Sequence, residues 1–150
     1  MAADAPEVVR LRGVMLTAMR GPEAAAPGPW VEASVARVRR WVDDPDVAIM
    51  VVDRPGGLAA CAIGTVEYSL GDPHNPEGVR GQVFNVATDP DHRRRGHGHA
   101  CLVAVLSWFD GRYVPVVDLT ATAEGEPLYR DLGFVTRTRP AMRRVLPTHT

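Results

Sequence analysis

The chain has 150 residues, with 17 Lys and Arg against 18 Asp and Glu and a formal net charge of −1. This length predicts one domain that buries about two thirds of its unfolded surface, and the balanced charge disfavours nucleic acid as a partner. No run of about 18 apolar residues occurs and the first residues lack the regions of a secretion signal, so we expect neither a membrane protein nor an exported one.

Two helices are predicted in the first third of the chain. Asp4 and Glu7 have the spacing of a capping box, and the apolar residues that follow recur at helical spacing over about 6–19. Pro29 suits the first turn of a second helix, which the acidic and proline residues at 43–45 end.

Three strands are predicted next. Residues 47–52 are an apolar run of strand length, and 58–68 is the expected hairpin partner after a Pro-Gly-Gly turn. Residues 70–81 are rich in Gly and Pro and predict a long loop before a strand at 82–88. We expect these strands to form a buried central sheet. Cys61 falls in this strand pattern, and its surroundings favour a buried free thiol.

The segment after the third strand has the features of a phosphate-binding loop. Asp89 and the proline after it stop the strand, and Gly96 and Gly98 let the backbone approach a ligand closely. Three arginines at 93–95 precede a helix predicted to begin near His99, and a helix N-terminus already favours anions. We therefore predict that this loop binds a diphosphate or a comparable anion.

Two better-known phosphate motifs fit this loop poorly. A Walker loop requires a lysine that the chain lacks. A dinucleotide fingerprint would use Gly96 and Gly98, with Asp118 as the ribose-binding acid 20 residues after Gly98, but Cys101 occupies its third glycine position. The pattern Arg-x-x-Gly-x-Gly, which begins at Arg93, fits without exception and favours a pyrophosphate loop.

The last third of the chain alternates helices and strands. We predict that the helix beginning near His99 continues to about 109, followed by a strand over 114–119, a short helix over 126–132 and one or two strands within 134–146. Cys101, at the start of the first of these helices, is expected to be a second buried free thiol, and free thiols fit a reducing, cytoplasmic compartment. Residues 127–134 read Pro-Leu-Tyr-x-x-Leu-Gly-Phe.

The arginine loop and this last motif lie in order about 30 residues apart, and together they resemble the GCN5-related N-acetyltransferase (GNAT) family. The resemblance implies a single domain over 1–150 with an α/β GNAT fold, a mixed central β-sheet flanked by helices. Family members usually open with a strand. Only residues 1–3 precede the first helix here, so we expect that edge strand to be missing or vestigial, which leaves a homodimer open as a way to cover the sheet edge.

The resemblance also implies a reaction, the transfer of acetyl from acetyl-coenzyme A to a primary amine of a small molecule, peptide or protein. The residues it assigns to the coenzyme are Val86, Ala87, Thr88, Arg93, Arg94, Arg95, Gly96, His97, Gly98 and His99. Tyr129 stands at the position of the general acid, the alternative being a packing residue. Glu67 is the best carboxylate for a general base; the alternatives are that ordered water takes the proton and that Glu67 is a solvated residue at a strand end.

Three residues are candidates for contact with the acceptor. Asn85 lies in an otherwise apolar strand, where an amide requires hydrogen bonds, and either an acceptor contact or a structural bond satisfies it. Trp30 and Tyr68 are candidate pocket residues, and core packing is their alternative role.

Two further alternatives concern the kind of function. His92, His97 and His99 invite a metal hypothesis, but the neighbouring arginines would repel a cation, so we expect no metal. A non-catalytic acyl-coenzyme A sensor that kept the loop and lost turnover is the alternative to an enzyme. Neither interpretation involves nucleic acid or a membrane.

Overall fold

The structure, a computed structural model, describes residues 2–148. The chain divides into two compact units, Met1–Thr120 and Ala121–Thr150, and the single domain expected over 1–150 stays a prediction. None of the described helices has the length and apolar character that crossing a bilayer requires.

The first unit is built on a four-stranded sheet in the order β1-β2-β3-β4. The strands are β1 (Val47–Arg54), β2 (Gly57–Tyr68), β3 (Val79–Thr88) and β4 (Val116–Leu119). The first three pair in antiparallel fashion and β4 runs parallel to β3. The expected mixed α/β architecture is thereby confirmed.

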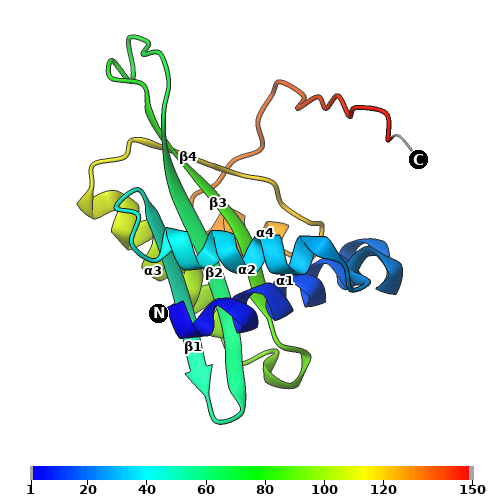
Figure 1. The fold of residues 1–150 in the computed structure, drawn as a ribbon. Coiled ribbons are helices and arrows are strands. Elements are labelled where there is room, and N and C mark those ends of the chain that lie inside the picture. Colours follow the sequence, from blue (N-terminus) through cyan, green and yellow to red (C-terminus); the bar gives the residue numbers. More distant parts are fainter. Residues whose placement is uncertain (1, 149–150) are drawn as a thin grey trace. The chain divides into compact units, whose positions relative to one another are not determined.

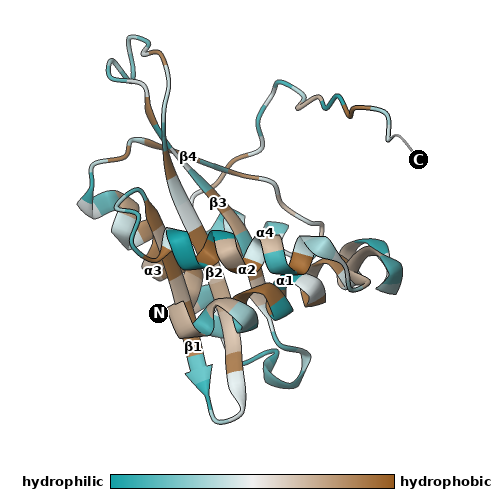
Figure 2. Cartoon of the chain, viewed as in Figure 1, coloured by the Kyte–Doolittle hydropathy of each residue, from teal (hydrophilic) through white to brown (hydrophobic). Residues whose placement is uncertain are grey.

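Helices cover both faces of this sheet (Figure 1). The helices α1 (Ala5–Arg20) and α2 (Pro29–Trp41) pack on one face, and α3 (His97–Gly111) packs on the other. Because successive strand residues face opposite sides, a sheet covered twice must be apolar on both faces. The strands are accordingly among the most hydrophobic parts of the unit in Figure 2, and the middle of β2 is buried without interruption.

Two glycines let α3 approach the sheet closely. A Cβ built on Gly81 would lie 2.6 Å from Cε1 of Phe109, and one built on Gly64 would lie 2.6 Å from Cγ1 of Val105. The Phe109 side chain is fully buried. The sheet therefore keeps these two positions free of side chains so that one aromatic ring can fill the space.

The start of the chain differs in detail from expectation. Residues 2–4 form a short 3₁₀ helix, η1 (Ala2–Asp4), and not a strand. This agrees with the prediction that the first edge strand is missing or vestigial. The capping box is wrong, because the Asp4 side chain makes no capping hydrogen bond. Glu7 instead accepts a hydrogen bond from the backbone N–H of Leu58, at 3.0 Å, so a tertiary partner replaces the local one.

The second unit contains α4 (Glu126–Asp131). Gly133 has a positive φ of 94° after the helix, as a left-handed cap requires. The strands predicted within 134–146 are wrong, since residues 134–148 form none. Val135 and Met142 are 83% and 93% exposed, and a strand without a packed face or a paired edge is not stable in water.

Replacing Gly81 with Ala should destabilise the first unit, because the new methyl group meets the Phe109 ring within the core. Overpacking of this kind lowers the free energy of unfolding by about 1–3 kcal/mol, measurable by urea denaturation. Gly111→Ala is the matched control, since a Cβ there meets nothing within 4 Å. Equal stability of the two variants would contradict the close approach of α3.

Candidate functional site

A β-bulge interrupts β3 near its end. Cys61 pairs with Ala87 and Ile63 with Phe84, so two residues of β3, Asn85 and Val86, lie opposite one residue of β2. Asn85 has a φ of 55°, a left-handed conformation that asparagine tolerates better than most residues. A bulge bends its strand and leaves backbone groups unpaired.

The Asn85 side chain is buried and held from two sides. Its Oδ1 accepts a hydrogen bond from Nη1 of Arg12 at 3.2 Å, and its Nδ2 donates to Sγ of Cys61 at 3.5 Å. Burial raises the pKa of Cys61 to about 12, so the thiol keeps its proton and donates to the backbone carbonyl of Asn85. The Asn85 amide therefore makes structural hydrogen bonds, one of the two roles expected for it.

The last part of β3 also lacks a partner on its β4 side. Parallel pairing runs from Arg80 opposite Val116 to Val83 opposite Leu119, where β4 ends. Within the described residues, the segment 84–88 has no strand on that side. Its backbone groups there are available to a ligand.

The loop after Thr88 folds tightly before α3. Oδ1 of Asp89 accepts a hydrogen bond from the Asp91 N–H at 2.9 Å and caps a short 3₁₀ helix, η3 (Pro90–His92). Gly96 takes the left-handed conformation at the N-cap of α3 with a φ of 77°. The helix begins at His97, two residues earlier than the sequence predicts.

The loop carries positive charge and unsatisfied donors or acceptors. Arg93, Arg94 and Arg95 are exposed, and no ion pair is found for them within residues 2–148. Nδ1 of His92 and Nε2 of His97 are buried without a hydrogen-bond partner in the same range. Burial and the nearby Arg54 lower the pKa of His97. These groups fit an anionic ligand that accepts hydrogen bonds.

The other end of the loop is fastened by Arg10 of α1. Its Nη1 donates to Oδ2 of Asp89 at 2.6 Å, its Nε to Oε2 of Glu7 at 2.7 Å, and its Nη2 to the carbonyl of Leu58 at 3.0 Å. The Arg10 hydrogen bond lowers the pKa of Glu7. The Asp91 N–H and then Arg10 lower the pKa of Asp89. Sequence reasoning missed Arg10, whose only local signal is its spacing from Glu7.

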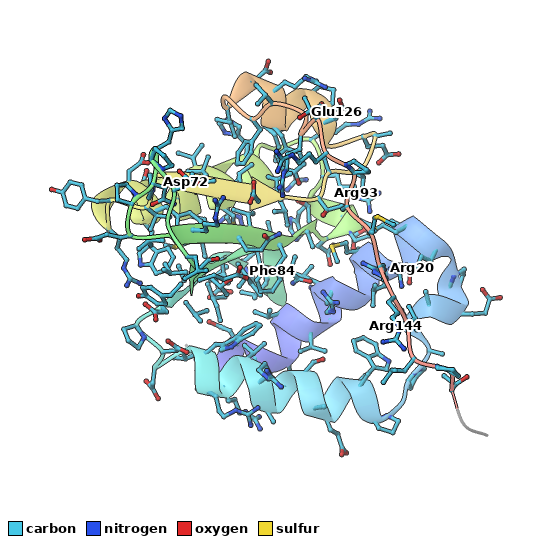
Figure 3. All side chains as sticks on the ribbon, turned by 90° about the horizontal axis from the view of Figure 1, so that it is seen from above. Arg20, Asp72, Phe84, Arg93, Glu126 and Arg144 are labelled. Atoms are coloured by element: carbon cyan, nitrogen blue, oxygen red, sulfur yellow. The ribbon has the colours of Figure 1, made fainter. Side chains whose placement is uncertain are left out.

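A cavity of about 400 Å³ lies between α1, α2 and the sheet, and both Trp30 and Asn85 line it. Figure 3 shows Phe84, another lining residue, on the side of the sheet that faces these helices. Arg12 and Arg37 also line it, and sequence reasoning missed both. A second hollow of about 760 Å³ borders Trp30, Pro90 and Arg93.

Two predicted residues lie elsewhere. Tyr68 is 65% exposed, lines neither cavity, and donates its hydroxyl to Asp46 at 2.9 Å. Glu67 is exposed and pairs in register with Arg80. Arg80 is eight residues before Thr88, roughly 26 Å along the strand at about 3.3 Å per residue. The first unit therefore does not bring Glu67 to the arginine loop.

Tyr129 belongs to α4 in the second unit. Its ring packs edge-on against Phe134 with centroids 6.0 Å apart, and its backbone carbonyl accepts a hydrogen bond from the Phe134 N–H at 3.0 Å. Burial raises the pKa of Tyr129, so its hydroxyl is protonated at neutral pH. Within residues 121–148 this hydroxyl has no hydrogen-bond partner.

No three His, Cys, Asp or Glu side chains among the described residues are arranged to hold a metal ion. The two cysteines are free and buried, as predicted.

Comparison with known proteins identifies relatives of this fold. The sequence matches the model of the acetyltransferase (GNAT) family over residues 16–134. A search of curated proteins found no match. Among solved structures, a GCN5-related N-acetyltransferase from Ralstonia eutropha JMP134 is 25% identical, with a TM-score of 0.80 over 95% of this chain and 94% of that one.

Two more distant structures share the fold. A predicted acetyltransferase from Clostridium acetobutylicum, solved with acetyl-coenzyme A, is 17% identical, with a TM-score of 0.82 over 96% of this chain and 92% of that one. Glucosamine-6-phosphate N-acetyltransferase from Arabidopsis thaliana is 16% identical, with a TM-score of 0.73 over 96% and 93%.

The Arg10 contacts predict a particular pH dependence of stability. Glu7 and Asp89 have lowered pKa values in the folded state, so their contribution is complete above the unfolded value of about 4 and is lost as the pH falls through the folded values. Arg10→Gln should lower the free energy of unfolding by about 1–2 kcal/mol at pH 7 and by less at pH 3.

Urea denaturation at both pH values measures this difference. Arg20→Gln, at the exposed end of the same helix, is the control and should change little at either pH. If Arg10→Gln lowers the free energy of unfolding equally at pH 7 and pH 3, the carboxylates of Glu7 and Asp89 do not contribute to stability through this arginine.

Proposed function

The chain belongs to the acetyltransferase (GNAT) family, and we propose that it moves an acetyl group from acetyl-coenzyme A to a primary amine of a small molecule, peptide or protein. The observation that carries this proposal is the loop before α3. There, three arginines lack ion-pair partners within residues 2–148 and two buried imidazole nitrogens lack hydrogen bonds. Such a loop suits the diphosphate of coenzyme A.

Two segments would hold the coenzyme. The backbone edge of Val86, Ala87 and Thr88 on the β4 side would bind the pantetheine arm, because β4 ends opposite Val83. The diphosphate would be bound by the loop residues Arg93, Arg94, Arg95, Gly96, His97, Gly98 and His99. When bound, the coenzyme supplies a thioester whose acyl carbon accepts an amine. The Clostridium acetobutylicum relative, solved with acetyl-coenzyme A, supports this choice of cosubstrate.

Tyr129 is the proposed general acid. Its hydroxyl holds a proton at neutral pH because burial raises its pKa, and a leaving thiolate, with a thiol pKa of about 8.5, requires one. This role needs Tyr129 to reach the end of β3. We therefore propose that residues 1–150 act as a single acetyltransferase domain.

The acceptor amine must lose a proton before it attacks. Asn85 and Trp30 would contact the acceptor from the cavity that they line, and none of the described residues lining that cavity is an acid. Since Glu67 lies toward the other end of β3, we favour water as the route for this proton. The role of Glu67 as a base stays a prediction.

The free thiols of Cys61 and Cys101 suit the proposed cytoplasmic location.

Tyr129→Phe should separate an enzyme from a sensor. If the hydroxyl donates a proton, turnover falls roughly 100-fold or more, while stabilisation by acetyl-coenzyme A is unchanged. Release of free thiol over a panel of amines measures turnover, and thermal unfolding with acetyl-coenzyme A measures binding. Tyr113→Phe is the matched control, because Tyr113 is 90% exposed.

Unchanged turnover in Tyr129→Phe would make that tyrosine a packing residue. A wild-type protein that binds acetyl-coenzyme A but turns over no amine would favour the sensor. An absence of binding would contradict both functions.

A further inference from the structure

The cavity between α1, α2 and the sheet has a size and a lining that suit an apolar group. Its volume of about 400 Å³ lies within the range of small-molecule sites. Val8 and Val9 of α1 and Trp30 of α2 form part of its wall. Trp41 and Phe84 also line it, and their rings meet edge-on with centroids 5.7 Å apart.

The charged groups in this wall all have the same sign. Arg12 and Arg37 line the cavity, and no Asp or Glu among residues 2–148 does. Arg12 is half-buried, and the neutral Oδ1 of Asn85 is its hydrogen-bond partner in the structure. Neither arginine has an ion-pair partner within residues 2–148.

Other partly buried arginines of the unit are neutralised. Arg80 meets the carboxylate of Asp72 at 3.5 Å, and Arg112 meets Asp46 at 2.7 Å. A guanidinium has five N–H donors, and removing such a charge from water is unfavourable without an anionic partner. Arg12 is therefore able to bind a carboxylate or phosphate that residues 2–148 do not provide.

We propose that this cavity selects acceptors in which the amine is joined to an apolar body and an oxyanion, a carboxylate or a phosphate, that Arg12 and Arg37 bind. This inference rests on the proposed acetyl transfer. Arg12 is hydrogen-bonded to Asn85 within the bulge, so an oxyanion on Arg12 lies beside the strand segment that would hold the acyl group. The two positive charges also disfavour acceptors that carry additional cationic groups.

A matched series of acceptors tests the proposal. Phenylalanine, its neutral amide and its phosphonic acid analogue share one apolar body and differ in the charged group, and leucine and methionine with their amides vary the body. The specificity constant kcat/KM with acetyl-coenzyme A should favour the acids over the amides by roughly 10- to 100-fold, the range of one charge-assisted hydrogen bond. The phosphonate distinguishes a carboxylate site from a phosphate site.

Variants connect the preference to the two arginines. Arg12→Gln should reduce the ratio of acid to amide to about one, Arg12→Lys should restore part of it, and Arg37→Gln should lower it without affecting the fold. Arg39 is exposed on α2, as Arg37 is, but does not line the cavity. Arg39→Gln should therefore leave the ratio of acid to amide unchanged. Calorimetric titration with the N-acetylated acids and amides provides a binding readout that does not depend on turnover.

The outcomes separate the two proposals. If the protein acetylates neutral amines as well as the acids, or if Arg12→Gln keeps the preference, the oxyanion site is overturned while acetyl transfer stands. If none of the acids or their acetylated forms binds or reacts, the oxyanion site is also overturned. If acetyl-coenzyme A itself does not bind, the proposed function fails first.

Discussion

The bulge in β3 is the irregularity on which the candidate site depends. By placing Asn85 and Val86 opposite a single residue of β2, it bends the strand where pairing with β4 has already ended at Val83. The backbone of 84–88 is therefore open on one edge, and the Asn85 side chain is turned toward α1. One extra residue thus places Asn85 in the wall of the cavity, beside a strand edge that β4 leaves unpaired.

Two arginines of α1 hold this strand from the same helix. Arg10 contacts Asp89, just after β3, and Arg12 contacts Asn85 within the bulge. They differ in how their charge is balanced, because Arg10 has two carboxylate partners and Arg12 has an amide. The first arrangement stabilises the start of the arginine loop, whereas the second leaves a positive charge available beside the cavity. Two arginines within a single turn of one helix therefore have differently balanced charges.

The order of elements up to the short helix of Tyr129, including the glycine-containing loop before α3, is predictable from sequence, because glycine, proline and hydrophobic spacing are local signals. The bulge is not, since nothing beside Asn85 in the sequence distinguishes a left-handed residue from a regular strand residue. Arg10 and Arg12 acquire their roles from partners 73 to 79 positions away. The apolar residues within 134–146 predicted strands, but residues 134–148 form no strand in the structure.

The proposed function requires the loop before α3 to bind an anionic cosubstrate through its three arginines. Calorimetric titration with acetyl-coenzyme A should compare wild type with a variant in which Arg93, Arg94 and Arg95 are Gln. In the control variant Arg20, Arg39 and Arg40 are Gln, so it loses the same net charge away from the loop and measures the effect of net charge alone. Affinity at least about tenfold weaker in the loop variant alone is the expected result. Equal affinity in all three proteins would contradict the claim.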